Sequence, residues 1–304
     1  IDAVVGFPEG VGGYVHNAAA LLRDGTVAGI SRKTELPNYG VVDEHRYFTP
    51  GAGPLLIDSG GVGCLITICE DIWVAGGAVE RLARERRPGL VLNLSASPFH
   101  AGKLAERHAT AARFARAAGA AVCYANLVGG QDELVFDGGS FAVAADGRLA
   151  AAAQRFVEDL LLVDFGPGSG GAPAPVAASF PPGPDRLGEI HAALVLGTRD
   201  YLGKNRFSKA VVGLSGGIDS ALTAAIAVEA LGADRVVGVS MPSRFNSGET
   251  RSDAARVAEN LGIRFLEIPI QEVYEGYLGL LAGPFDHRDP GIAGENLQAR
   301  VRGN

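Results

Sequence analysis

Apolar positions recur along this chain in short segments, some with the length expected of strands and some with that of helices. In the first half, two strands are predicted within residues 17–33, joined at Asp24 and Gly25, a pair typical of a tight hairpin turn. A second hairpin turn is predicted at Asp146 and Gly147. The other strands predicted here cover residues 1–7, 63–69, 91–94 and 121–125, and the helices cover residues 78–87 and 104–118.

The second half shows a more regular alternation of strand and helix. Strands are predicted from Val211 and over residues 235–240 and 264–268, and helices over residues 185–201, 220–230, 252–261, 271–281 and 294–302. This alternation predicts a parallel sheet covered by helices, with ligands at the carboxyl ends of its strands. Between the halves, residues 166–184 are rich in Gly, Pro, Ala and Ser. We therefore expect domains at 1–165 and 185–304, joined by a linker at 166–184.

Composition narrows the classes of protein that fit this pattern. A length of 304 residues suits two modest domains, and the net charge of −7 argues against nonspecific binding to nucleic acid. No apolar run reaches the length of a membrane span. Cys64, Cys69 and Cys123 form a sparse, odd set, which favours free thiols and a cytoplasmic location. Cys64 and Cys69 are expected on one strand with side chains on opposite faces.

A glycine-rich segment follows the strand that begins at Val211 and precedes the helix at 220–230. Such a turn presents backbone N–H groups and the positive end of a helix, which is a site for phosphate. The alternative is a tight turn whose glycines serve geometry alone, but Ser215, Asp219 and Ser220 favour a functional loop. The segment lacks the Lys of a Walker A loop. Asp219 instead offers a carboxylate that can hold Mg²⁺.

The motif SGGIDS resembles the SGGxDS loop of the ATP pyrophosphatase family, whose members cleave ATP between the α- and β-phosphates. This resemblance implies Mg²⁺ at Asp219 and a doubly wound parallel-sheet domain similar to the adenine nucleotide alpha hydrolases. The residues implied to bind ATP are Gly213, Leu214, Ser215, Gly216, Gly217, Ile218, Asp219 and Ser220.

In the first half, Cys69 ends the motif ITIC and is followed by Glu70 and Asp71. Taken alone, Cys69 is more typical of a small core residue and Lys33 of a surface lysine. The upstream motif RKTELPNYGVVDE and the Cys69 strand together resemble nitrilase-type amidases, which have a Glu-Lys-Cys triad and an α-β-β-α sandwich fold. The resemblance implies that Cys69 is the nucleophile and Lys33 the catalytic lysine. A nearby ammonium would lower the pKa of the thiol and stabilise an oxyanion.

The general base of such a triad lies well upstream of the lysine, so we expect it outside this chain. Ile1 opens inside a strand-like run and Asn304 follows a helical stretch without a cap, so both ends are expected to continue in a longer protein. The motif SASPFHAGK resembles the substrate loop of glutaminases of the nitrilase type. By this match, Ser97 and Lys103 contact glutamine together with Tyr39.

A nitrilase-type glutaminase followed by an SGGxDS domain resembles the family of glutamine-dependent NAD⁺ synthetases. In that family, ammonia from glutamine displaces AMP from adenylated deamido-NAD⁺, with ATP and Mg²⁺. The expected substrates are therefore glutamine, deamido-NAD⁺ and ATP, in a homo-oligomer that binds neither nucleic acid nor membrane. Asn296 and Arg300 are implied to contact deamido-NAD⁺, although both positions also suit an exposed helix.

Three rival hypotheses remain open. The chain is an amidase with a nucleotide-sensing module, another ATP-loop amidotransferase such as GMP synthetase, or a noncatalytic folded remnant. The paired Lys33 and Cys69 argue against the second rival, because its glutaminase has another fold.

Overall fold

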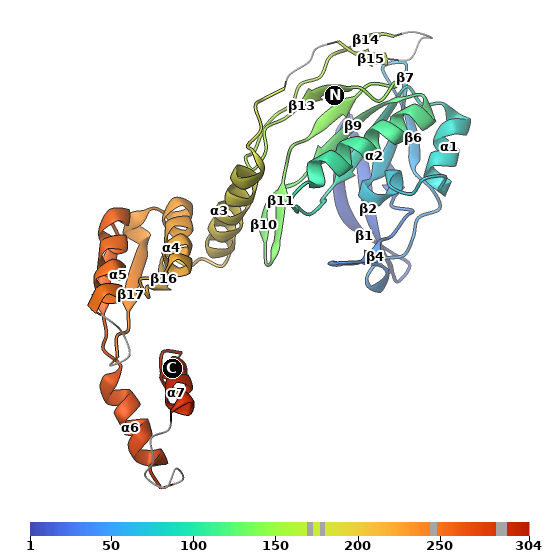
Figure 1. Cartoon of the computed structure of the whole chain (residues 1–304). Helices are drawn as coiled ribbons and strands as arrows, with labels where there is room; N and C mark the ends of the chain where they lie inside the picture. Colours follow the sequence, from blue (N-terminus) through green and yellow to red (C-terminus); the bar gives the residue numbers. More distant parts are fainter. Residues whose placement is uncertain (169–172, 177–179, 244–247, 284–290, 304) are drawn as a thin grey trace. The chain divides into compact units, whose positions relative to one another are not determined.

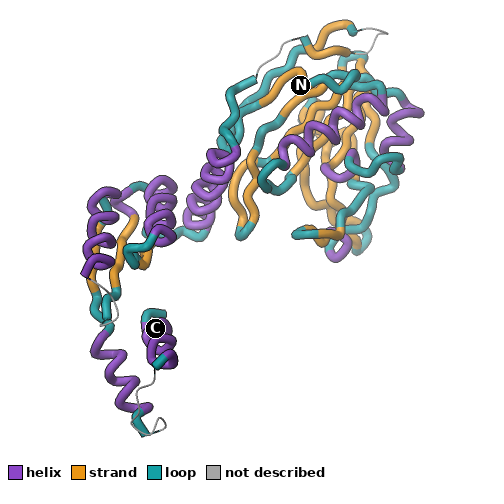
Figure 2. Tube along the Cα trace, viewed as in Figure 1, coloured by secondary structure: helices purple, strands orange, loops and turns teal. Residues whose placement is uncertain are grey.

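The computed structural model describes residues 1–168, 173–176, 180–243, 248–283 and 291–303 (Figure 1). The chain divides into two compact units, Ile1–Ala193 and Leu194–Asn304, and the division falls within helix α3 (Arg186–Lys204). Figure 2 shows that strands and helices are both present in each unit. The two units are therefore described separately.

The first unit begins with a three-stranded antiparallel sheet in the order β1-β2-β3. Its strands are β1 (Ala3–Val11), β2 (Tyr14–Arg23) and β3 (Thr26–Arg32). Asp24 and Gly25 have φ of 49° and 74°, the left-handed conformation that the predicted hairpin turn requires. The first strand runs beyond the predicted residues 1–7, because β1 pairs with β2 up to Val11. Pro8 is accommodated because β1 is an edge strand of this sheet.

A second sheet has six strands in the order β13-β12-β9-β8-β7-β6. Its central strands β7, β8 and β9 are parallel, as expected of strands connected through helices, and the outer neighbours pair antiparallel. The six strands are β6 (Leu55–Ser59), β7 (Val62–Ile68), β8 (Leu90–Ser95), β9 (Ala121–Asn126), β12 (Phe141–Val143) and β13 (Leu149–Ala152). The predicted turn at Asp146 and Gly147 lies between β12 and β13.

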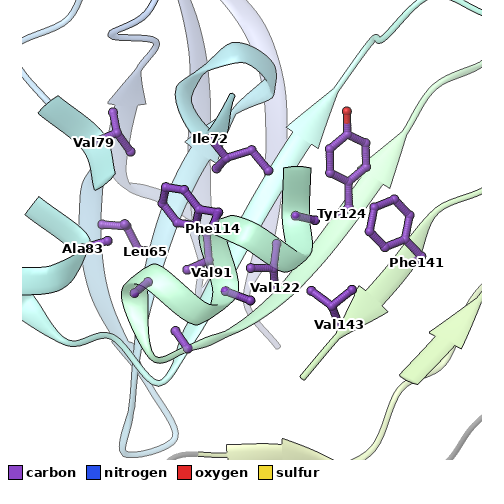
Figure 3. Packing of buried hydrophobic residues seen from close by; sticks show 14 residues of the cluster. Leu65, Ile72, Val79, Ala83, Val91, Phe114, Val122, Tyr124, Phe141 and Val143 are labelled. Atoms are coloured by element: carbon purple, nitrogen blue, oxygen red, sulfur yellow. The ribbon is translucent and has the colours of Figure 1, made fainter. Parts of the chain in front are cut away.

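The two faces of this six-stranded sheet form two cores. Helices α1 (Ala78–Arg86) and α2 (Lys103–Ala118) cover one face, where Leu65 and Phe114 are buried in one cluster (Figure 3). On the other face, Ile66 packs against Leu21 of the first sheet. Successive residues of a strand point to opposite faces, so Leu65 and Ile66 stabilise different layers. The unit therefore contains a helix layer and two sheet layers.

Short elements complete the first unit, and several of them were not predicted. They are β4 (Asn38–Tyr39), β5 (Val42–Asp43), the 3-10 helices η1 (Glu44–Arg46) and η2 (Cys69–Ile72), β10 (Val128–Gln131), β11 (Leu134–Asp137), β14 (Phe165–Pro167) and β15 (Pro173–Pro175). β14 and β15 pair antiparallel, and apart from Phe165 both strands lie in the segment expected to be a linker. Residues 169–172 and 177–179 of that segment lie outside the described part of the chain.

The second unit contains a parallel sheet in the order β16-β17-β18, which confirms the alternation predicted for this half. Alanines of α4 and α5 pack with Leu214, Val236 and Ile263 in one core. The strands are β16 (Ala210–Gly213), β17 (Val236–Ser240) and β18 (Arg264–Glu267). The helices are α4 (Ile218–Leu231), η4 (Ala233–Arg235), α5 (Gly248–Leu261), α6 (Gln271–Leu281) and α7 (Ile292–Val301).

Among the described residues, none of the helices combines the length and the apolar character needed to cross a membrane.

The core beneath α2 predicts a large effect of one truncation. Phe114 is fully buried, so Phe114→Ala is expected to lower the free energy of unfolding by about 3–5 kcal/mol, through lost burial and the cavity left behind. Val27 is exposed in the same unit, and Val27→Ala is expected to change the free energy of unfolding by less than about 0.5 kcal/mol. Chemical denaturation of both variants tests this, and equal effects would contradict the assigned core.

Candidate functional site

Cys69 lies at the carboxyl end of the central strand β7, at the first residue of η2. Its φ is 47°, in the left-handed region that a residue with a side chain adopts only when its surroundings enforce it. Cys64 is buried within β7 itself. The prediction that Cys64 and Cys69 share one strand was therefore wrong by one residue, because the chain turns sharply after Ile68. The turn takes the thiol out of the alternating pattern of the strand.

The buried carboxylate of Asp71 joins this turn to the segment that follows β3. Its Oδ2 accepts a hydrogen bond from the Ile68 N–H at 2.9 Å, and its Oδ1 accepts bonds from the Thr34 and Glu35 N–H groups, both at 2.9 Å. Burial raises the pKa of Asp71 to about 6, although the three N–H donors favour the ionised form. Asp71 therefore fixes the segment of Lys33 beside the segment of Cys69.

Lys33 is almost completely buried, with 1% of its surface exposed, so the alternative of a surface lysine is wrong. Its Nζ donates to Glu44 Oε1 at 2.6 Å. Lys33, Glu44 and Cys69 line one cavity of about 570 Å³. The sequence motif contained Glu44 but gave it no role. An acid eleven residues after a lysine is not a recognisable pair until the loop between them folds back.

From the sequence, Lys33 was expected to lower the pKa of the Cys69 thiol, but the net shift in the structure is upward. Burial raises the pKa of the Cys69 thiol above its ordinary value, and the charge of Lys33 acts against this without outweighing it. Glu70 and Glu44 raise this pKa further. Because Glu44 is paired with Lys33, the ammonium that was expected to lower the pKa is partly neutralised by its own partner.

A second cavity, of about 230 Å³, also contains Cys69 and Glu44 in its lining. It brings together the three residues predicted to contact glutamine, which are Tyr39, Ser97 and Lys103. Cys69 therefore lines two cavities, one shared with the predicted glutamine contacts and the larger one shared with Lys33.

Two side chains that the sequence did not single out organise this second cavity. The Tyr39 hydroxyl donates to the Glu70 carboxylate, with both oxygens at 2.9 Å. The Lys103 ammonium lies 4.3 Å from the centre of the Trp73 ring and 3.0 Å from Glu106 Oε2. Glu70 lies within η2 and Trp73 directly follows it, so proximity to Cys69 in the sequence was the available signal for both.

The glycine-rich loop of the second unit joins β16 to α4, as predicted. Gly216 has a φ of 83°, which favours glycine. The hydroxyls of Ser215 and Ser220 lie 3.2 Å apart, and Ser215 Oγ accepts a hydrogen bond from the Gly217 N–H at 3.2 Å. Asp219 is exposed in the first turn of α4. The positive end of this helix therefore meets a hydroxyl-lined turn, an arrangement suited to phosphate.

A cavity of about 210 Å³ beside this loop includes Arg302 in its lining, which the sequence did not predict. Arg302 Nε donates to the Met241 carbonyl at 3.1 Å. Asn296 and Arg300, the predicted dinucleotide contacts, are exposed on α7 and are not among the described residues that line this cavity. Arg302 directly follows α7, and whether it or Arg300 reaches the cavity depends on tertiary packing, which no motif encodes.

The donor set for a metal is sparse. Among the described residues, no group of three or more His, Cys, Asp or Glu side chains could hold a metal ion. Asp219 offers a single carboxylate. This fits Mg²⁺, which commonly takes one or two protein carboxylates together with substrate phosphates and water.

The charges around Cys69 predict opposite effects of two substitutions on thiol reactivity. Lys33→Met removes the cation and is expected to slow alkylation of Cys69 by iodoacetamide at pH 8, whereas Glu44→Gln removes an anion and is expected to accelerate it. The rate for the unchanged protein should still rise above pH 9, because the pKa of the thiol is raised.

Mass spectrometry of the Cys69 peptide measures these rates, with Cys64 and Cys123 as internal references in the same samples. Equal rates in the two variants would contradict the electrostatic assignment.

Family models match both parts of the chain. Residues 1–172 match the carbon–nitrogen hydrolase model and residues 190–304 match the NAD synthase model. The glutamine-dependent NAD(+) synthetase of Thermotoga maritima is 42% identical, over 95% of this chain and 55% of the relative. That of Xanthomonas campestris is 43% identical, over 100% of this chain and 55% of the relative. The chain thus spans about half the length of these relatives.

The solved structures agree with this match. The glutamine-dependent NAD⁺ synthetase from Acinetobacter baumannii in complex with ADP has a TM-score of 0.92 and 38% identity, covering 100% of this chain and 57% of that one. The predicted nitrilase-like and parallel-sheet fold classes are therefore confirmed, and the described residues of the first unit supply one of the two helix layers of the sandwich. The chain belongs to the carbon–nitrogen hydrolase family, and a domain of the NAD synthase family follows that domain in the same chain.

Proposed function

We propose that the protein is a glutamine-hydrolysing NAD⁺ synthetase, in which ammonia from glutamine amidates adenylated deamido-NAD⁺. The observation that carries this proposal is the convergence of Cys69, Tyr39, Ser97 and Lys103 on one cavity, in a chain that also has the SGGIDS loop. Identity of 42–43% to glutamine-dependent NAD(+) synthetases supports it.

In the first unit, we assign Cys69 as the nucleophile. Its sulfur attacks the side-chain amide carbonyl of glutamine, the amide nitrogen leaves as ammonia with the thiol proton, and water then releases glutamate. Buried Lys33 supplies positive charge on the side of Cys69 that lines the larger cavity, where it can stabilise the oxyanion. The base that first accepts the thiol proton was expected outside this chain, and this stays a prediction.

The second cavity supplies opposite charges for the two ends of an amino acid. The Lys103 ammonium suits the α-carboxylate of glutamine, and the Glu70 carboxylate suits its α-ammonium group. The Tyr39 hydroxyl bonds to Glu70 and thereby orients it. Ser97 is buried at the same cavity and offers a hydroxyl. A lysine binds a carboxylate as a point charge, without the bidentate geometry of arginine.

In the second unit, we assign Gly213 to Ser220 to the phosphates of ATP. The supporting features are the glycine turn, the paired serine hydroxyls and the N-terminus of α4. Asp219 would hold Mg²⁺, which neutralises phosphate charge when bound. Asn296 and Arg300 stay proposals for deamido-NAD⁺, and their exposure leaves them accessible to a ligand.

The domain division at 1–165, 166–184 and 185–304 is likewise kept as a proposal, as are a cytoplasmic location and a homo-oligomer. The three cysteines are free, in agreement with a reducing compartment.

The two-site proposal predicts distinct losses in the full-length protein. Cys69→Ala should abolish NAD⁺ formation with glutamine and preserve it with free ammonia, because only the nitrogen source depends on the thiol. Asp219→Ala should abolish both reactions, because activation of deamido-NAD⁺ is lost. Release of AMP and pyrophosphate and formation of NAD⁺ are the measurements.

Cys64→Ala and Asp234→Ala are the matched controls, and both should leave these rates unchanged. If Cys69→Ala lowered NAD⁺ formation from glutamine and from free ammonia equally, as Asp219→Ala is expected to do, the two-site proposal would be wrong. If the unchanged protein hydrolysed glutamine without releasing AMP or pyrophosphate, the alternative of an amidase with a nucleotide-sensing module would replace it.

Recognition of the amino-acid end of glutamine predicts a separate effect. Glu70→Gln keeps an oxygen for the Tyr39 hydroxyl but removes the charge, so KM for glutamine should rise about tenfold, or about 1.4 kcal/mol of binding free energy. The rate with free ammonia should not change. An unchanged KM for glutamine would contradict the role of Glu70.

A further inference from the structure

The loop between β8 and α2 carries Ser97 and leads into Lys103, the first residue of α2, and a chain of four buried or nearly buried charges lies behind it. Arg107, on α2, is completely buried and is the first member of the chain. The second member is Asp137, at the end of β11, and the third is Arg155. The fourth is Glu189, on α3. Two arginines and two carboxylates alternate, so the formal charges cancel. The proposed chemistry at Cys69 uses none of these four residues directly.

One end of this charge chain holds the start of the loop. Arg107 Nε donates to Ser97 Oγ at 3.1 Å, and its Nη2 donates to the Ser97 carbonyl at 2.6 Å and to the Pro98 carbonyl at 3.2 Å. The remaining nitrogen of the guanidinium donates to Asp137 Oδ1 at 2.6 Å. Ser97 is thus held through both its side chain and its backbone.

The other end of the charge chain holds the end of the same loop. Asp137 Oδ2 accepts from Arg155 at 3.0 and 3.1 Å, and Arg155 donates from its third nitrogen to Glu189 Oε2 at 2.9 Å. Glu189 Oε1 then accepts a hydrogen bond from the Gly102 N–H at 3.2 Å. Gly102 directly precedes Lys103 and has a φ of 88°.

We propose that Glu189 and Arg107 are positioning residues for glutamine, because one continuous charge chain fixes both ends of the loop that presents Ser97 and Lys103. This inference rests on the proposed glutaminase function. Glu189 acts at the Lys103 end and Arg107 at the Ser97 end, more than eighty residues apart in the sequence. Neither lines the cavity of Cys69, so their effect reaches glutamine only through the loop.

The middle of the loop is held by a backbone hydrogen bond and by ring packing rather than by ion pairs. The Phe99 N–H donates to the Val135 carbonyl at 2.7 Å, and the Phe99 ring packs edge-on against Phe156 with centroids 5.4 Å apart. The Arg155 guanidinium lies 4.9 Å from the centre of the Phe156 ring. Loss of the charge chain would therefore leave the loop attached but with greater freedom at its two ends, which carry the binding side chains.

A substitution of Arg107 is unsuitable as the sole test, because removing one member of a fully buried ion pair can prevent folding. Glu189→Gln is milder: the amide oxygen can still accept from Gly102, while the charge that holds Arg155 is lost. Asp2→Asn is the matched control. It neutralises the carboxylate that pairs with Arg23 at 2.6 Å in the same unit, without contact to this loop.

Two measurements on the full-length protein test the inference. In Glu189→Gln, hydrogen exchange of the amides in residues 97–103 should accelerate about tenfold without substrate, and KM for glutamine should rise about tenfold with kcat changed less than about twofold. The rate with free ammonia should equal that of the unchanged protein. Asp2→Asn should show neither effect.

The outcomes separate this inference from the function on which it rests. If the unchanged protein hydrolyses glutamine but Glu189→Gln has the same loop exchange and the same KM, the positioning role is wrong. A loss of kcat and stability without a change in KM would show a merely structural role. If the unchanged protein does not hydrolyse glutamine, the proposed function fails, and the exchange of residues 97–103 alone decides whether the charge chain holds the loop.

Discussion

The first unit depends on one buried carboxylate, that of Asp71. Its three backbone donors come from two chain segments, one after β3 and one at the end of β7. These segments carry Lys33 and Cys69, which are thirty-six positions apart. A backbone N–H group buried without a partner is costly, so satisfying three of them with one side chain specifies a single arrangement. That arrangement places the lysine and the thiol on one cavity.

The other buried charges around Cys69 are each paired with a side chain of opposite charge. Lys33 is paired with Glu44, and the four residues behind the Ser97 loop alternate in sign. Buried pairs of this kind contribute little net stability compared with apolar packing, but an unpaired member is strongly destabilising. Their effect is therefore to select one conformation of the loops around Cys69. The apolar clusters on the two faces of the six-stranded sheet contribute most of the stability.

Local backbone geometry holds the candidate site of the second unit in place, whereas buried charges hold the site of the first unit. The SGGIDS loop lies at the carboxyl end of β16, where the chain passes from a strand into α4. Its hydrogen bonds are local, between Ser215, Gly217 and Ser220, so the loop conformation is encoded within six residues. This is why the motif was recognisable without knowledge of the rest of the fold.

By itself, the sequence determined the features whose physics is local. The hairpin at Asp24 and Gly25, the helices that end near Pro88 and Gly119, and the alternation of the second half all follow from turn chemistry and periodicity. The motifs around Cys69, Lys33 and Ser97 also indicated the family. Each of these signals is contained in a short segment.

Only the tertiary structure decided which distant groups meet. The pairing of Lys33 with Glu44, the raised pKa of the Cys69 thiol and the charge chain from Arg107 to Glu189 depend on contacts between separate elements. The packing of α7 decides that Arg302, and not Arg300, lines the cavity beside the glycine-rich loop of the second unit. Pairing, burial and helix rotation are set by the whole core, because the energy of a buried charge depends on every group around it.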